Sequence, residues 1–244
     1  MTYWESECRK LEIKLKITDC SNFLQWDFIK NDMFHEVHSN AFYELKNSTY
    51  WEKIKGALKE DEFGKPNKYY LYPESSGNLI HHAYSLFQLV KHFPDFNIDK
   101  IASVFEFGGG YGSWCRLLRR LGFNGTYIIY DFPCFLELQS FFLKKIGIGT
   151  EKTFFISNSN SSPWYTDLFV SLWAISESPS GLRLKILDKV FSKYVLIAYQ
   201  NIFEGIDNIL YFGDFIKNHL EYTWKNYEIP HIKNNYYLLG ERNV

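Results

Sequence analysis

The segment Glu106-Phe107-Gly108-Gly109-Gly110-Tyr111-Gly112 constrains the fold of this chain more than any other. It continues the apolar run 101–107, which predicts a strand, and it precedes 113–121, which predicts a helix. Glycines at such a turn allow the backbone to approach a ligand where a Cβ atom would collide, and the helix offers its free amides. The segment therefore predicts a nucleotide-type binding turn.

Short apolar runs alternate with helical patterns from residue 100 onward. Strands are expected at 101–107, 126–131, 152–156, 167–173, 193–199 and 236–240, and helices at 113–121, 135–146 and 180–191. This alternation predicts an α/β, Rossmann-like fold with a mostly parallel sheet and helices on both faces. Ligands of such sheets bind at the carboxyl ends of the strands.

The first hundred residues differ from this pattern and favour helices and loops. Apolar residues recur at helical intervals over 40–60, and Ser75-Ser76-Gly77-Asn78 supplies cap residues for a helix over 79–93. We expect residues 1–77 to form a helical extension that acts as a lid or as a contact between two copies, and residues 78–244 to form the Rossmann-like domain.

Charge and composition exclude several classes of protein. The net charge is -1, with 27 basic and 28 acidic residues, so a nucleic-acid partner is not expected, and Arg116, Arg119 and Arg120 suggest a solvated helix face. No apolar run is long enough to span a bilayer, and acidic residues precede any apolar stretch at the start. Cys115 and Cys134 lie among apolar residues, which favours free thiols and a cytoplasmic location.

Glycine spacing separates two nucleotide-type cofactors. The dinucleotide pattern GxGxxG, begun at Gly108, requires glycine at position 113, which is Ser113. The alternating spacing Glu106, Gly108, Gly110, Gly112 is the form of the methyltransferase nucleotide loop. Asp131 ends the second strand 19 residues beyond Gly112 (131 − 112) and is suited to ribose hydroxyls of either cofactor.

Three segments resemble the bacterial sugar O-methyltransferases of the class I, S-adenosylmethionine-dependent fold. They are 104–112, Tyr127-Ile128-Ile129-Tyr130-Asp131-Phe132-Pro133, and 167–179, which ends Ser176-Glu177-Ser178-Pro179. The resemblance covers roughly residues 78–240. It departs from the family at Trp173-Ala174-Ile175, where the family often has a polar residue.

The resemblance implies S-adenosylmethionine bound over the first two strands. Glu106 then meets the methionine end, Asp131 the ribose, Ser157 and Asn158 the adenine, and Leu172 and Trp173 the transferred methyl group. The remaining cofactor residues expected on this basis are Phe107, Gly108, Gly109, Gly110, Gly112 and Phe132. Trp173 has an alternative role as a core residue.

Methyl transfer to oxygen also needs an acceptor for a proton. Glu177, His82 and His231 are the candidate bases: Glu177 lies in the Ser-Glu-x-Pro segment, His82 faces inward on the helix 79–93, and His231 precedes the last strand. We expect His81, by contrast, to lie on a solvated stripe with Ser85. A divalent metal is the less favoured alternative, because no tight acidic pair follows the fourth or fifth strand.

Polar and aromatic residues after the fifth strand suit a sugar. These substrate candidates are Tyr199, Gln200, Asp207, Asn208 and Tyr211, although Asp207-Asn208 suits a helix cap equally well. The sequence thus predicts an S-adenosylmethionine-dependent O-methyltransferase that acts on a nucleotide-linked or surface-glycan sugar and yields S-adenosylhomocysteine. Alternatives are N-methylation of an amino sugar or small metabolite, an NAD-dependent oxidoreductase, and a non-catalytic cofactor-binding module.

Overall fold

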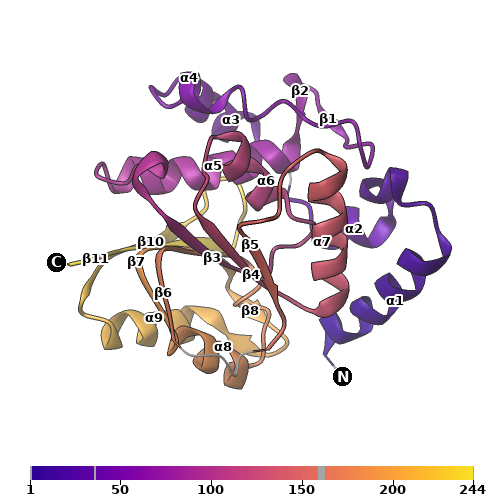
Figure 1. Ribbon diagram of the computed structural model, residues 1–244. Coiled ribbons are helices and arrows are strands. Elements are labelled where there is room, and N and C mark those ends of the chain that lie inside the picture. The colour runs from indigo at the N-terminus through magenta and orange to yellow at the C-terminus, as the bar shows by residue number, and fades with distance from the viewer. Residues whose placement is uncertain (1, 36, 159–162, 244) are drawn as a thin grey trace.

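A mixed sheet forms the centre of the computed structural model, which describes residues 2–35, 37–158 and 163–243 (Figure 1). In that part of the chain its seven strands lie in the order β10-β11-β7-β6-β3-β4-β5. Their bounds are β3 Ser103–Phe107, β4 Thr126–Tyr130, β5 Thr153–Ile156, β6 Trp164–Leu172, β7 Val190–Gln200, β10 Tyr222–Glu228 and β11 Asn235–Arg242. Strands β3 to β7 pair in parallel, whereas β11 runs antiparallel to both β7 and β10.

Helices cover both faces of this sheet (Figure 1). One face carries α5 Gly77–His92, α6 Ser113–Arg120 and α7 Pro133–Lys145, and the other carries α8 Ser180–Leu187 and α9 Asn208–Asn218. Alternate strand residues point to opposite faces, so Val104 packs in the core with Leu117 of α6 while Phe105 packs with Ile186 and Phe212. The Rossmann-like α/β fold is confirmed.

The strand order reverses beside β3. From β3 the chain adds β4 and β5 on one side, and it then crosses over to add β6 and β7 on the other. Two loops therefore leave the carboxyl ends of β3 and β6 in opposite directions and open a crevice between them. This crevice is where the glycine-rich turn lies.

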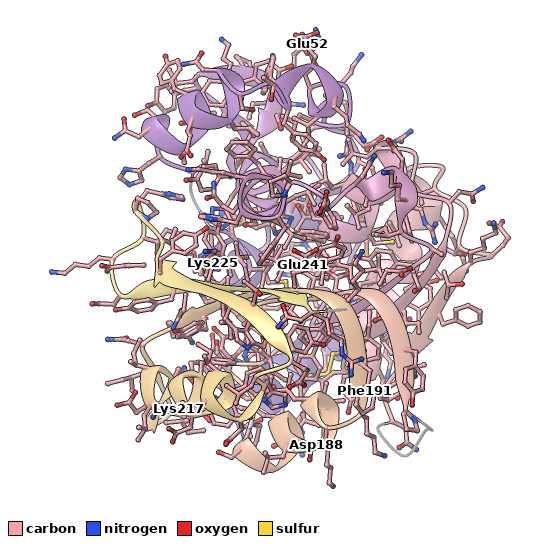
Figure 2. All side chains as sticks on the ribbon, turned by 90° about the vertical axis from the view of Figure 1, so that its left-hand side faces the viewer. Glu52, Asp188, Phe191, Lys217, Lys225 and Glu241 are labelled. Atoms are coloured by element: carbon pink, nitrogen blue, oxygen red, sulfur yellow. A yellow bond between two sulfur atoms is a disulfide. The ribbon has the colours of Figure 1, made fainter. Side chains whose placement is uncertain are left out.

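The N-terminal segment packs outside the layer of α5, α6 and α7 (Figure 1). It contains α1 Tyr3–Ile17, the 3-10 turn Cys20–Gln25, α2 Asp27–Asp32, α3 Ser39–Lys46, α4 Trp51–Ile54, β1 Lys68–Tyr69 and β2 Tyr72–Ser76. Figure 2 shows the layers from the side, with Glu52 of α4 above the sheet strands of Lys225 and Glu241, and Lys217 of α9 below them. A short 3-10 turn, Ile98–Lys100, leads into β3, and the hairpin of β8 Ile202–Phe203 and β9 Ile206–Asp207 follows β7.

The helical pattern over 40–60 is interrupted. Helix α3 ends at Lys46, and the Ser48 hydroxyl donates a hydrogen bond to the Leu45 carbonyl at 2.7 Å. Serine and asparagine compete in this way with helical backbone bonds, so the chain turns before α4 begins. The sequence also missed β10, because its residues alternate between half-buried and exposed and form no apolar run.

Two expectations about single side chains are wrong. Cys134 is not a free thiol: it forms a disulfide with Cys8 and joins α7 to α1, whereas Cys115 is free and buried as expected. Arg116 is not solvated, because its guanidinium is buried and donates to Asp61 at 2.7 Å and to the Ala57 carbonyl at 3.0 Å. Both contacts bind the N-terminal segment to the Rossmann-like layer.

None of the helices in the described ranges combines the length and the apolar content needed to cross a membrane.

Candidate functional site

A cavity opens at the carboxyl ends of β3, β4 and β6, beside the point where the strand order reverses. Its floor comes from residues 106–111, 130–133 and 172–174. Ser113, Trp114, Phe135, Ser157, Glu177, Ser178 and Leu182 extend the wall, and the N-terminal segment and α5 add Trp4, Asp32, Met33, His35 and His82. Residues of the N-terminal segment, of α5 and of the loops after β3, β4, β5 and β6 therefore surround one space.

The glycine loop is built for close approach on two sides. Gly108, Gly110 and Gly112 have φ values of 77°, 56° and 96°, the left-handed region that favours glycine. A Cβ atom on Gly108 would lie 2.0 Å from the Cβ of Ala174, so this glycine allows the β3 and β6 loops to touch. A Cβ atom on Gly110 would meet nothing within 4 Å, so the backbone there is bare toward the cavity.

Asp131 follows β4 and is held in place beside this loop. Its Oδ1 accepts from the Phe132 amide and its Oδ2 from Gln139 Nε2, both at 2.8 Å. Gln139 Nε2 also donates to the Gly110 carbonyl at 3.0 Å, so one amide of α7 ties the acid to the loop. Burial raises the pKa of Asp131 to about 7, against the lowering effect of these hydrogen bonds. The sequence did not reveal this role of Gln139.

Glu106 ends β3 on the cavity wall. It is buried, and its Oε2 accepts from the Tyr127 hydroxyl at 2.8 Å. Burial raises the pKa of Glu106 to about 8, and the charge of Asp131 adds to the effect. A cationic ligand bound beside the glycine loop would stabilise the charged forms of these two carboxyl groups and lower their pKa values.

Glu177 lies on the turn after β6 and faces the same cavity. Trp4 Nε1 donates to its Oε2 at 2.9 Å and Gln200 Nε2 to its Oε1 at 3.1 Å. Burial raises the pKa of Glu177 to about 7, which is near neutrality. Gln200 therefore reaches the site through Glu177, and Trp4 is a site residue that no motif in the sequence marked.

Trp173 also lines the cavity, in an unusual conformation. Its φ of 67° is left-handed, a strained region for a bulky residue and one that clusters at functional sites. Trp173 Nε1 donates to Asn235 Oδ1 at 2.6 Å, and the His35 ring stacks on the indole with centroids 3.6 Å apart. The indole is both largely buried and part of the cavity wall, so the core interpretation fits it, and its role beside the transferred methyl group stays a prediction.

The histidines divide into those that face the cavity and those that do not. His82 lines it, with Nδ1 3.1 Å from Ser113 Oγ, and burial lowers the pKa of His82 to about 3. His231 lies behind the wall, with Nε2 3.5 Å from His81 Nδ1. The expectation that His81 is solvated is wrong, because His35 of the N-terminal segment covers it. His35 itself was missed.

None of the five substrate candidates lines the cavity, and only Gln200 approaches it, through its hydrogen bond to Glu177. Tyr199 is buried against Phe212 and donates to Asn226, and Asp207 caps α9 by accepting from the Leu210 amide. The remaining two hold Arg183: Asn208 accepts from Nη1 at 2.6 Å, and Tyr211 lies under the guanidinium. Tyr199, Asn208 and Tyr211 thus pack on the α8 and α9 face, and the hydrogen bond of Asp207 confirms its interpretation as a helix cap.

The cofactor candidates are placed more closely together. Among them Glu106, Phe107, Gly108, Gly109, Gly110, Asp131, Phe132, Ser157, Leu172 and Trp173 line the cavity. Gly112 begins α6 just behind the loop, and Asn158 is exposed beyond Ser157 and outside the cavity wall. Most of the cofactor candidates predicted from the sequence thus line one cavity.

Charge distinguishes this wall from an ordinary phosphate site. Its described residues include the acids Asp32, Glu106, Asp131 and Glu177 and no lysine or arginine. Across the described ranges, no three His, Cys, Asp or Glu side chains are placed to hold a metal ion. The wall favours a ligand that carries positive charge.

Solved structures show a likeness to this chain, whereas no family model and no curated protein matches it. Precorrin-6y C5,15-methyltransferase from Geobacter metallireducens GS-15 is similar, with a TM-score of 0.49, 13% identity, and coverage of 77% of this chain and 98% of that one. Magnesium protoporphyrin IX methyltransferase from Synechocystis PCC 6803 has a TM-score of 0.49, 9% identity, and coverage of 84% and 100%.

An O-methyltransferase family protein from Burkholderia thailandensis is also similar, with a TM-score of 0.47 and 11% identity. The match covers 67% of this chain and 59% of that protein, so this chain spans about three fifths of its length. At these identities and TM-scores the likenesses say nothing about what this chain binds. The fold assignment rests on its own strand order and register.

Proposed function

We propose that this protein is an S-adenosylmethionine-dependent methyltransferase whose acceptor is a sugar hydroxyl. The observation that carries the cofactor proposal is the bare backbone at Gly110, which faces a cavity shared with Asp131. A ligand can lie against the loop there while its ribose hydroxyls donate to the Asp131 carboxylate.

The acidic wall supports S-adenosylmethionine over a dinucleotide. The sulfonium and ammonium groups of S-adenosylmethionine are cationic, whereas NAD carries two phosphate charges. Four acids and no lysine or arginine among the described lining residues favour the first over the second. Ser113 in place of the third dinucleotide glycine points the same way.

The lining residues fit this cofactor in their expected roles. Glu106 accepts from the methionine ammonium, Phe132 and Ser157 border the adenine, and Leu172 and Trp173 flank the methyl group. The contact of Asn158 with the adenine remains a prediction. When bound, the cofactor supplies an electrophilic methyl carbon, and the protein aligns an acceptor oxygen with it.

The sugar assignment rests on the resemblance of 131–133 and 176–179. Glu177 supports it, because this residue can act as the base for a hydroxyl acceptor. A carboxyl group with a pKa of about 7 at the cavity can accept the hydroxyl proton near neutral pH. His82 and His231 are weaker candidates for the base, since His82 is engaged with Ser113 and His231 lies behind the wall. Trp4, Trp173 and Phe135 offer apolar faces for a sugar ring.

One observation favours a second acceptor class. The acids Asp32 and Glu177, with no compensating lysine or arginine in the described wall, also suit an ammonium group. An amino sugar is therefore the second candidate, with methyl transfer to nitrogen. The N-terminal segment serves in either case as a lid, because Trp4, Asp32 and His35 close the cavity.

Calorimetry tests the cofactor. S-adenosylhomocysteine should bind with measurable heat and NAD should not, and binding of NAD alone would contradict the proposal. Tyr211→Phe, on the far face of the sheet, serves as a control that should bind S-adenosylhomocysteine like the parent chain.

A methyl-release screen tests the acceptor. Matched pairs of hexose and amino-hexose, each free and as its sugar nucleotide, separate oxygen from nitrogen and neutral from anionic acceptors. With an acceptor in hand, Glu177→Gln should lower turnover at saturating S-adenosylmethionine about 100-fold, with affinity for S-adenosylhomocysteine, which lacks the sulfonium charge, nearly retained. His82→Ala and His231→Ala should lower it less, and an unchanged rate in Glu177→Gln would rule out its role as base.

A further inference from the structure

Five of the seven histidines gather around Trp173 at the rear of the cavity. They come from three distant segments: His35 and His38 precede α3, His81 and His82 lie on α5, and His231 lies between β10 and β11. His82 is engaged with Ser113 of the glycine loop. The other four form a row that leads away from the cavity.

The row runs from the cavity wall to the surface. His35 lines the cavity, and its ring centroid is 5.6 Å from that of His81. His81 is fully buried, and its ring centroid is 5.6 Å from that of His231. The ring centroids of His231 and His38 are 6.0 Å apart. His38 is exposed. Imidazole centroids at these separations allow ring nitrogens of neighbours to meet directly or through one water molecule.

The ring nitrogens are arranged as a relay requires. An imidazole passes a proton by taking it on one nitrogen and releasing it from the other. His81 Nδ1 and His231 Nε2 are 3.5 Å apart, while His81 Nε2 and His231 Nδ1 are buried and make no hydrogen bond within the described residues. Each central ring thus uses one nitrogen for its partner and has a second, unpartnered nitrogen on a ring that packs beside His35 or His38.

Burial keeps the rings of His35, His81 and His231 neutral between turnovers. Burial lowers the pKa of His35 and of His231 to about 4, and lowers that of His81 well below its usual value. Glu44 acts against this on His231, and the neighbouring histidines act with it. Neutral rings at His35, His81 and His231 carry a proton without storing it, and they do not repel a cationic cofactor.

We propose that His35, His81, His231 and His38 form a proton exit path from the cavity to solvent. This inference rests on the proposed methyl transfer, in which the acceptor O–H bond breaks, an O–CH3 bond forms, and the S–CH3 electron pair stays on sulfur. The released proton enters at a His35 ring nitrogen, and one proton leaves His38 to water. The path serves an oxygen or a nitrogen acceptor, whichever group first takes the proton.

Hydrogen exchange at the rings tests the path without an acceptor. The full chain is labelled with 15N-histidine, and the exchange of the His81 ring proton with water is measured by NMR without ligand. His231→Phe keeps an aromatic ring and removes both nitrogens, so it should slow this exchange about tenfold. His92→Phe, on the same helix but outside the row, is the matched control and should leave it unchanged.

A second variant guards against a folding effect. His38→Phe lies at the exposed end, and it should slow His81 exchange about threefold with an unchanged melting temperature. Exchange at the parent rate in both His231→Phe and His38→Phe overturns the path. Because the experiment uses the unliganded chain, a parent protein that fails to bind S-adenosylhomocysteine counts against the proposed function alone.

Discussion

The two sides of the cavity arise in different ways. The glycine-loop side, Glu106 to Gly112 with Asp131, comes from one strand-turn-helix-strand unit in which each residue is placed by its near neighbours. The N-terminal side consists of Trp4, Asp32 and His35, which reach the cavity through tertiary packing across more than a hundred residues. Local geometry thus fixes what class of ligand fits, and long-range packing fixes how the cavity is closed.

The largest effect should come from separating the two sides at the disulfide. Cys8 of α1 and Cys134 of α7 lie 126 residues apart, and a cross-link over so long a loop contributes about 4 kcal/mol through the unfolded chain. Reduction with a phosphine should therefore lower the melting temperature by about 10 °C in a chain of this size. Circular dichroism with and without reductant measures the shift.

Cys20 provides the matched control for that experiment. It is a free thiol in the same N-terminal segment, so Cys20→Ser should retain the full response to reductant, whereas Cys8→Ser should melt low in either condition. Equal melting temperatures for the oxidised and reduced parent would show that the two sides are held together by packing alone.

The next effect tests the local side at Gly110. In Gly110→Ala the added methyl group points into the open cavity, so affinity for S-adenosylhomocysteine should fall about 100-fold, while the left-handed φ costs the fold only about 1 kcal/mol. Calorimetry and thermal melts separate the two. Gly108→Ala should do the reverse and mainly destabilise, since its methyl group meets Ala174.

Gly213→Ala, in the interior of α9 and far from the cavity, should leave affinity unchanged and raise stability by about 1 kcal/mol. Retained affinity in Gly110→Ala would mean that the ligand does not lie against this loop.

The same division explains what the sequence could predict. The β3 turn, its alternate glycines and Asp131 follow from short patterns, so their place was predicted. Trp4 sits in an ordinary amphipathic helix, and its bond to Glu177 depends on how α1 packs, which no spacing encodes. The pairing of Cys8 with Cys134 is hidden for the same reason.

The error at His81 is the most instructive. Its polar stripe on α5 resembles a solvated face, yet that face is covered by the N-terminal segment, and Ser85 of the same stripe finds a buried partner in Tyr237. Periodicity distinguishes polar from apolar faces, but it does not tell whether a polar face meets water or a second polar surface.

A smaller effect tests the long-range side at Trp4. Trp4→Phe keeps the ring contact with Phe135 and removes the donor to Glu177, so the pKa of Glu177 should rise further and leave it neutral at pH 7. Affinity for S-adenosylmethionine should then fall about tenfold, because a neutral carboxyl group no longer attracts the cationic sulfonium. Trp51→Phe, outside the cavity, controls for the loss of an indole. Equal affinities of Trp4→Phe and Trp51→Phe for S-adenosylmethionine would show that Trp4 does not contribute to binding it.

The smallest effect is a pH dependence that involves both sides. The pKa values of Asp131 and Glu177 are raised to about 7 in the unliganded fold, which binds their protons more tightly than the unfolded chain does. Their contribution to stability is therefore complete below about pH 4 and is lost as pH rises through 7. A cationic ligand with ribose hydroxyls favours the ionised carboxylates, so its binding must release protons.

Affinity for S-adenosylmethionine should consequently rise about threefold between pH 6.5 and 7.5, even as the unliganded chain becomes less stable. Calorimetry in buffers of different ionisation enthalpy counts the released protons. Asp131→Asn should lose part of this slope, whereas Asp207→Asn, which alters only the α9 cap, should keep it. An affinity that is flat or falls across this range would mean that the ligand leaves both carboxyl groups protonated, and the acidic wall would then not select its charge.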